Sequence, residues 1–166
     1  MCKKKRPECN FRLYELSAKD KTRYWKMFAR HHYLSHSHNN AARCFVGTLN
    51  GEIALFTSIL PFPHPIVKNT WKEHRTVVLP DYQGLGLSNI TGDYIGEMLK
   101  KEGKCYITTT SNPARIATLK KNAKWICTRI GRSSSGSGKI QNKHKKGSTS
   151  CERITISFKY IGENNG

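Results

Sequence analysis

The dipeptide Asn50-Gly51 constrains the fold of this chain more than any other local feature. It joins two apolar segments, residues 43–49 and 52–60, whose composition is typical of β-strands. Asn-Gly is favoured in two-residue hairpin turns because both turn positions need a positive φ. The sequence therefore predicts a tight antiparallel strand pair near the middle of the chain.

Other segments predict that helices lie between further strands. The expected strands are at residues 11–16, 70–79, 105–110, 125–130 and 153–160, in addition to the hairpin. The expected helices are one that starts near residue 17, then 88–101 and 113–121. This order of elements predicts an α/β or α+β fold with a mixed sheet.

The expected helices have recognisable starts and apolar faces. Ser17, with Asp20 three residues later, is placed to cap the first helix. Asn112 and Pro113 are typical of the cap and the first residue of the last helix. The side chains expected to face the core are Tyr24, Trp25, Met27 and Phe28 in the first helix, and Ile90, Tyr94, Ile95 and Met98 in the second.

A length of 166 residues favours a single domain. We expect a basic N-terminal tail at residues 1–10, a folded domain at 11–160 and a C-terminal tail at 161–166. Within the domain, residues 132–150 are rich in Ser, Gly and Lys and predict a mobile basic loop. No apolar run reaches about 18 residues, so no transmembrane helix or membrane partner is expected. The 6 cysteines form no C-x-x-C pair and no apolar signal segment is visible, which predicts a reduced, cytoplasmic protein.

The chain carries 29 Lys and Arg against 11 Asp and Glu, a net charge of +18. Residues 112–159 hold twelve of the basic residues and one acidic residue. Basic segments often serve solubility alone, and one small anionic cofactor needs only a few positive groups. Neutralising several phosphates of a nucleic acid, expected to be double-stranded DNA, accounts for the excess better. The residues expected to contact it are Lys139, Lys143, Lys145 and Lys146.

A glycine-containing turn, residues 83–88, lies between an expected strand and an expected helix. Glycines let the backbone approach a ligand closely, and the first N–H groups of a helix are free to bind phosphate. The turn is not a dinucleotide fingerprint, because Asn89 stands where the third glycine would be, and no Gly-Lys-Ser/Thr follows for a P-loop. A phosphate-binding turn and an ordinary strand–turn–helix connection both stay open.

Four histidines in a short stretch raise the question of a metal site. His32 and His36 have i,i+4 spacing, but the residues around them do not predict a stable helix. No nearby carboxylate completes a ligand set for them or for His31 and His38. No bound metal is expected.

The turn resembles the pyrophosphate loop of the GNAT acyltransferases, whose pattern is Gln/Arg-x-x-Gly-x-Gly/Ala. Gln83, Gly86 and Ser88 fall on the defining positions, with Ser88 in place of the usual Gly or Ala. The resemblance implies a GNAT-like, mostly antiparallel central sheet flanked by helices and an acetyl-CoA or related acyl-CoA cofactor. The turn would hold the pyrophosphate, and the preceding strand would pair with the pantetheine arm. The implied cofactor-binding residues are Val77, Val78, Leu79, Gln83, Gly84, Leu85, Gly86, Leu87 and Ser88.

Further segments resemble one divergent group of GNAT-like proteins. They include His32-Tyr33-Leu34, Pro61-Phe62-Pro63-His64-Pro65, Glu73-His74-Arg75 and Thr109-Thr110-Ser111-Asn112-Pro113-Ala114. The group contains the phage DNA-modifying Mom family and acetyltransferase-like domains found with ABC-type ATPases, and the resemblance covers roughly residues 11–130. It implies modification of the exocyclic amine of adenine in DNA, which a phage uses against restriction.

Acyl transfer to an amine needs a proton acceptor and donors for the developing oxyanion. The histidine of the His32-Tyr33 pair could accept a proton and the tyrosine could stack on a base, or both could serve packing. Arg75 could face the surface, or could grip an anion or a planar base. Many GNAT enzymes carry a Tyr where residues 111–115 have none, which leaves Ser111 as the nearest hydroxyl. The candidate catalytic residues are His32, Tyr33, Arg75, Asp93 and Ser111, although Asp93 is equally interpretable as an exposed helical residue.

These features favour a GNAT-fold acyltransferase-like enzyme that modifies nucleic acid, with Mom-type modification of adenine in phage DNA as the main hypothesis. One alternative is an acetyl-CoA-dependent N-acetyltransferase acting on a protein or a small-molecule amine. The other is a GNAT-derived nucleic-acid-binding module that has lost catalysis. Acetyl-CoA binding separates the two enzymes from the module, and mass analysis of nucleosides separates the two enzymes from each other.

Overall fold

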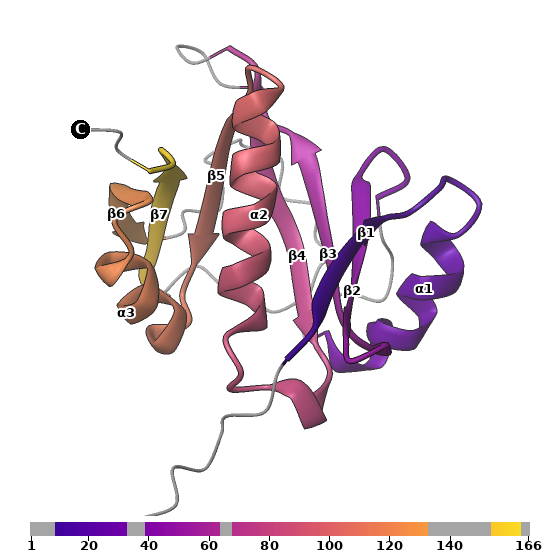
Figure 1. Cartoon of the computed structure of the whole chain (residues 1–166). Helices are drawn as coiled ribbons and strands as arrows, with labels where there is room; N and C mark the ends of the chain where they lie inside the picture. Colours follow the sequence, from indigo (N-terminus) through magenta and orange to yellow (C-terminus); the bar gives the residue numbers. More distant parts are fainter. Residues whose placement is uncertain (1–8, 33–38, 64–67, 133–153, 164–166) are drawn as a thin grey trace, which may run out of the picture.

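The computed structural model describes residues 9–32, 39–63, 68–132 and 154–163. They form a seven-stranded sheet in the order β1-β2-β3-β4-β5-β7-β6 (Figure 1). The strands are Phe11–Glu15 (β1), Arg43–Leu49 (β2), Glu52–Pro61 (β3), Thr70–Val78 (β4), Cys105–Thr110 (β5), Trp125–Arg132 (β6) and Ile154–Tyr160 (β7). The α-helices are Lys21–Phe28 (α1), Leu87–Lys101 (α2) and Pro113–Lys121 (α3). Only the β4–β5 pair is parallel among these neighbours, which confirms the predicted mixed, mostly antiparallel α+β domain.

The predicted hairpin joins β2 to β3. Asn50 and Gly51 both have positive φ, 53° and 91°. Asn50 also anchors the chain ahead of β1, because its N–H donates to the Asn10 carbonyl oxygen at 2.8 Å and its Oδ1 accepts from the Asn10 N–H at 2.9 Å. Asn10, predicted to end the N-terminal tail, therefore already belongs to the folded unit.

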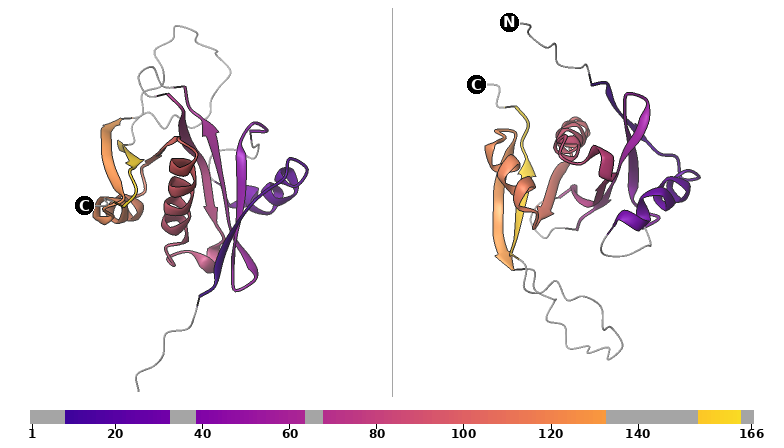
Figure 2. Two further views of the ribbon diagram at one scale, coloured as in Figure 1. Left: turned by 45° about the horizontal axis from the view of Figure 1, so that its top comes forward. Right: turned by 90° about the horizontal axis from the view of Figure 1, so that it is seen from below.

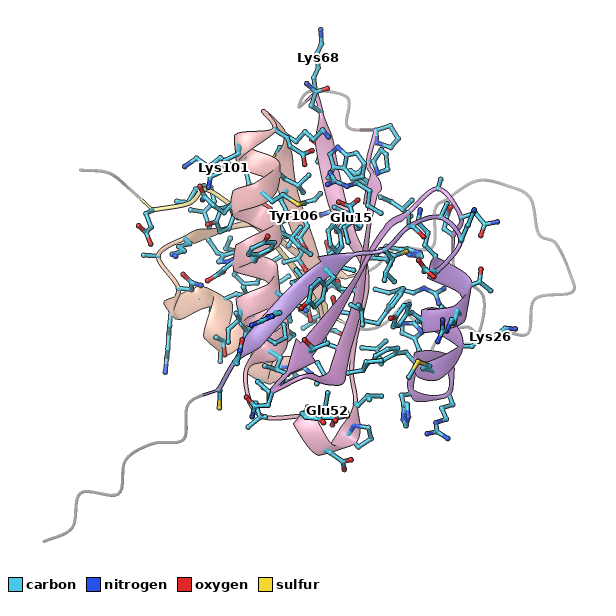
Figure 3. All side chains as sticks on the ribbon, turned by 45° about the vertical axis from the view of Figure 1, so that its right-hand side comes forward. Glu15, Lys26, Glu52, Lys68, Lys101 and Tyr106 are labelled. Carbon is cyan, nitrogen blue, oxygen red and sulfur yellow. The ribbon has the colours of Figure 1, made fainter. Side chains whose placement is uncertain are left out.

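Helices cover both faces of the sheet. Seen from below, the sheet curves around α2, and α1 lies on its outer side (Figure 2). Under α2, Ile95 packs with Tyr106, which Figure 3 labels beside that helix. On the opposite face, Trp25 and Phe28 of α1 pack on the ring of Phe56. With both faces of its middle covered, the sheet offers ligands access mainly at its edges and where its strands separate.

The buried faces of the helices differ in part from the prediction. The predicted core residues that are exposed are Met27 (44%), Ile90 (50%) and Tyr94 (56%). In α2 the buried face instead contains Gly92 and Gly96. A Cβ at Gly96 would come within 2.4 Å of the Tyr160 ring, and one at Gly92 within 3.4 Å of Trp125. The close approach of the two glycines to aromatic rings sets the orientation of α2. The large side chains on the opposite face of the helix are therefore exposed.

The predicted cap of α1 is wrong, whereas that of α3 is confirmed. α1 begins at Lys21 after Asp20, and the Ser17 Oγ donates to the Asp20 carboxylate at 2.5 Å instead of accepting from a helix amide. In α3 the Asn112 Oδ1 accepts from the Arg115 N–H at 3.1 Å. The difference follows from Ser17 lying in a separate turn ahead of the helix.

Two segment boundaries also differ from the prediction. Arg132, predicted to begin the basic loop, ends β6 and pairs with Ile154; residues 133–150 of that loop lie outside the described residues. Ile161, predicted to begin the C-terminal tail, donates its N–H to the Lys124 carbonyl oxygen at 2.9 Å. Within the described segments, no helix has the length and apolar character needed to span a membrane.

Candidate active site

β4 and β5 separate midway along their length, and this opening positions the site. Their parallel pairing is confined to residues 70–72 and 105–107. On the other edge of β4, the register with β3 shifts between Ser58 and Ile59 and leaves His74 as an extra residue. Such a bulge bends a strand and increases its twist. Figure 1 shows the two strands diverging behind α2 toward their carboxyl ends.

A cavity of about 890 Å³ fills the opening. Its walls come from the carboxyl half of β4, the glycine turn before α2, the junction of β5 with α3, and His31 and His32 after α1. Pockets for cofactors and small molecules have volumes of roughly 300–1,000 Å³. The cavity is therefore large enough for a ligand, with one end at the start of α2 and another beside α1.

The glycine turn leads directly into the 15-residue helix α2. Gly84 and Gly86 have φ of 83° and 76°, a left-handed backbone that glycine adopts without strain. The Asn89 N–H bonds back to the Gly86 carbonyl oxygen at 2.9 Å, whereas the N–H groups before it have no intrahelical acceptor. A Cβ at Gly86 would meet no atom within 4 Å, so the turn is open there. Open N–H groups at a helix start suit the binding of phosphate.

A buried ion pair links β4 to α3 across the opening. Arg115 donates from Nη1 and Nη2 to the two carboxylate oxygens of Glu73, at 2.9 and 2.6 Å. The side chains are 13% and 9% exposed. Thr76 Oγ1 donates to Glu73 Oε1 at 2.6 Å. The extra residue at His74 lets Glu73 and Thr76, three positions apart, lie on the same face of the strand.

The environment of Glu73 keeps it ionised. Burial raises the pKa of Glu73, but the Arg115 charge and hydroxyl donors from Thr76 and Thr108 outweigh this effect and leave the pKa below its ordinary value. Burial and the nearby Glu73 charge raise the pKa of Tyr106 well above its ordinary value. A carboxylate with a low pKa is a weak proton acceptor. Glu73 is therefore suited to holding the wall of the cavity and not to general base catalysis.

On the side of the cavity next to α1, the Arg75 guanidinium lies over an aromatic ring. Its Cζ is 4.9 Å from the Trp25 ring centroid. Trp25 is 3% exposed and contacts the His32 ring edge-on at 5.7 Å and the Phe56 ring at 5.3 Å. Burial lowers the pKa of Arg75 from its ordinary value, and a guanidinium remains charged at neutral pH. This side of the cavity therefore presents the positively charged Arg75 guanidinium, stacked on a buried ring.

The cavity brings together many of the residues predicted for the site. The predicted residues that line it are His32, Arg75, Ser111, Val77, Val78, Gln83, Gly84, Gly86, Leu87 and Ser88. Leu79 and Leu85 are not on the lining, and Leu85 is 55% exposed. The predicted residues that lie outside the described ones are Tyr33, Lys139, Lys143, Lys145 and Lys146.

Asp93 lies on α2 away from the cavity lining. Its Oδ1 accepts from the Trp125 Nε1 at 2.6 Å, and its Oδ2 accepts from the Asn122 Nδ2 at 3.0 Å. These bonds attach α2 to the segment between α3 and β6. The geometry gives Asp93 a structural role.

Glu73 and Arg115 are site residues that sequence reasoning missed. They are 42 positions apart, and neither local sequence indicates the partner. One signal was present, since a carboxylate inside an expected central strand needs a buried partner if it faces inward.

Two of the four closely spaced histidines lie in the part of the chain that the structure describes. No group of three or more His, Cys, Asp or Glu there is arranged to hold a metal ion. His31 and His32 line the cavity, whereas His36 and His38 lie outside the described residues.

The chain is similar to known acetyltransferases in sequence and in fold. The family model described as the acetyltransferase (GNAT) family matches residues 10–123. No curated protein gives a significant sequence match.

Solved structures show the same fold at low sequence identity. The ribosomal-protein-S18-alanine N-acetyltransferase from Escherichia coli is 19% identical over 95% of this chain and 99% of that chain, with a TM-score of 0.61. A GNAT acetyltransferase from Streptococcus pneumoniae is 15% identical over 92% and 100%, with a TM-score of 0.64. A GNAT acetyltransferase from Elizabethkingia anophelis with acetyl-CoA bound is 12% identical over 93% and 99%, with a TM-score of 0.58. The sequence match over more than half of the chain, on this fold, shows that the protein belongs to the GNAT acetyltransferase family.

Proposed function

We propose that this protein is an acetyl-CoA-dependent N-acetyltransferase. The observation that carries the proposal is the junction of an open glycine turn, the start of α2 and the separated strands β4 and β5 around one cavity. The cofactor would be held by the N–H groups of residues 84–88 at its pyrophosphate and by Val77 and Val78 along its pantetheine arm. Acetyl-CoA is bound in the Elizabethkingia anophelis enzyme of the same fold.

The residues present fit this cofactor. The lining contributed by the turn carries no acidic side chain that would repel phosphate. Asn89 lines the cavity next to the turn, and its buried Oδ1 has no hydrogen-bond partner among the described residues, so it can accept from a donor of the ligand such as an amide N–H of the pantetheine arm. When bound, acetyl-CoA supplies a thioester carbonyl that an amine nitrogen can attack with release of a thiol.

A residue of the cavity would accept the proton that the acceptor amine loses. An amine attacks only in its neutral form, so a group in the site must accept a proton. Glu73 is unsuited because Arg115 holds its pKa low. The His32 imidazole lines the cavity and is of the type that accepts protons near neutral pH. We assign His32 as the proton acceptor and Ser111, on the β5 side, as a hydroxyl donor.

Calorimetry with acetyl-CoA tests the proposal, using Gly86→Asp and Gly86→Asn as a matched pair. Both side chains tolerate the left-handed backbone of this position, and both have the same open space. Only the aspartate places a negative charge at the pyrophosphate site. We expect the asparagine variant to retain more affinity than the aspartate variant by at least about tenfold. Absence of acetyl-CoA binding by the wild type would contradict the function and leave a non-catalytic module.

A nucleic-acid amine is a second candidate acceptor, favoured by the net charge of +18. The resemblance to the Mom family points to the exocyclic amine of adenine in double-stranded DNA, whereas the Escherichia coli relative is named for an alanine of a ribosomal protein. Mass analysis of nucleosides from cells that express the protein distinguishes these acceptors. A modified deoxyadenosine that is absent when His32→Ala is expressed supports the DNA acceptor.

The lysines of the predicted basic loop give an independent test of DNA contact. Each lost phosphate contact should flatten the plot of log affinity against log salt by about 0.9 on duplex DNA. Replacing four lysines by Gln should therefore change the slope by up to about 3.6 without altering sequence preference. Parallel plots for both proteins would exclude the segment as a phosphate-binding surface. The replaced residues are Lys139, Lys143, Lys145 and Lys146.

A further inference from the structure

The charge on the cavity lining restricts the acceptors that the enzyme can bind. Glu73 is the sole acidic residue among the described ones that line the cavity, and both of its oxygens are bonded to Arg115. The other charged or imidazole side chains on the lining are His31, His32, His74 and Arg75. A polyamine or a lysine side chain, which enters with positive charge, finds no available carboxylate on this lining and meets like charge.

Arg75 and Glu73 act on opposite sides of β4. The partner of Glu73 comes from α3, whereas Arg75 lies over Trp25 of α1. Trp25 also belongs to the cluster that contains Val77, so Arg75 faces the α1 half of the cavity, away from the ion pair. The Glu73–Arg115 pair and the Arg75 guanidinium therefore lie in different halves of the cavity.

The position of Arg75 favours a bound anion. Its guanidinium is stacked on a buried ring, so little further ordering is needed when a ligand binds. Partial removal from water strengthens the attraction to a negative group, and the planar fork of N–H donors matches the two oxygens of a carboxylate or a phosphate. His32, which contacts the same tryptophan, places the assigned proton acceptor beside this cation.

We propose that the acceptor carries an anionic group, a phosphate or a carboxylate, close to its amine, and that Arg75 binds this group. The inference rests on the N-acetyltransferase function proposed above, and it names the class of acceptor for that site. Arg75 is then the residue that selects anionic amines over neutral and cationic ones.

Four aromatic amines of similar size test this selection: 4-aminophenylphosphonate, 4-aminobenzoate, 4-aminobenzamide and 4-(aminomethyl)aniline. They differ in the charge opposite the amine, from negative through neutral to positive. Their binding is measured by ligand-detected NMR with the protein alone and with the protein saturated with CoA, and their acetylation is measured separately. We expect the two anions to bind about 10- to 100-fold more tightly than the amide, and the cation to bind most weakly. The relative affinity of phosphonate and carboxylate distinguishes the two sources of the anion.

Arg75→Gln and Arg12→Gln form the variant pair, because both remove one positive charge. Arg12 is exposed, bonds Asn10 and is not on the cavity lining. Arg75→Gln should remove the preference for anions, mainly through KM, while Arg12→Gln should keep it. Equal binding of anions and amide by the wild type, or an unchanged preference in Arg75→Gln, would overturn the inference. Failure of CoA to bind would contradict the proposed function alone, since the preference is also measured without CoA.

Discussion

The Glu73–Arg115 pair offers a sharp test of how the cavity wall is held. Glu73→Gln keeps the shape of the side chain but removes its charge, and leaves Arg115, 13% exposed, without a counter-ion. Removing one partner of a buried pair costs about 3–5 kcal/mol. For a chain of 166 residues this corresponds to a fall in Tm of roughly 6–20 °C. We expect a loss in that range because two charge-assisted bonds and the bond from Thr76 are affected together.

Urea denaturation followed by fluorescence measures the free energy of unfolding. The double variant Glu73→Gln/Arg115→Met should recover much of the loss, since no charge is then left buried. Glu163→Gln breaks an exposed pair with Lys124 and should have no measurable effect. A loss below about 1 kcal/mol for Glu73→Gln would refute the assignment of a buried, mutually dependent pair.

The pH dependence of the same loss checks the ionisation of Glu73. Its pKa is lowered in the folded protein, so the stabilising contribution is present above the unfolded-state pKa of about 4.3 and is lost as the pH falls through the folded-state pKa. The difference between wild type and Glu73→Gln should therefore stay constant near neutral pH and shrink as the pH falls below about 4.3. If the difference in the free energy of unfolding does not change with pH, the Glu73 carboxyl has the same pKa in the folded and unfolded protein, which contradicts the prediction.

Two further predictions concern α2. Gly96→Ala should lower the free energy of unfolding by about 1–3 kcal/mol, because its Cβ would overlap the Tyr160 ring. Gly92→Ala should leave the free energy of unfolding unchanged or raise it by up to about 1 kcal/mol. Thermal denaturation of both variants measures the difference. The same direction of change in both would show that ring contact does not set the helix position. Asp93→Ala should lower stability by about 1–3 kcal/mol through the unsatisfied Trp125 Nε1, with kcat unchanged within about twofold. A large loss of kcat without a loss of stability would indicate that Asp93 is a catalytic residue.

The sequence by itself determined the features that depend on neighbouring residues. Asn50-Gly51 predicts its turn because the conformational requirement is contained in two residues, and Asn112 with Pro113 predicts the start of α3 for the same reason. The glycine turn at 83–88 was visible as a ligand-binding candidate because a strand, two glycines and a helix start follow one another directly. The mixed sheet followed from the order of these locally predicted elements.

Tertiary structure alone decided which side chains meet at the site. The register shift at His74 depends on how β4 pairs with β3, and it determines that Glu73 and Thr76 share a face. The pairing of Glu73 with Arg115 and the stacking of Arg75 on Trp25 join segments far apart in the chain, so no local pattern indicates them. Side-chain spacing also could not choose between the faces of α2, because the choice depends on the aromatic rings that its glycines approach. Such contacts arise when distant segments pack, and their energies depend on partners that a local sequence does not contain.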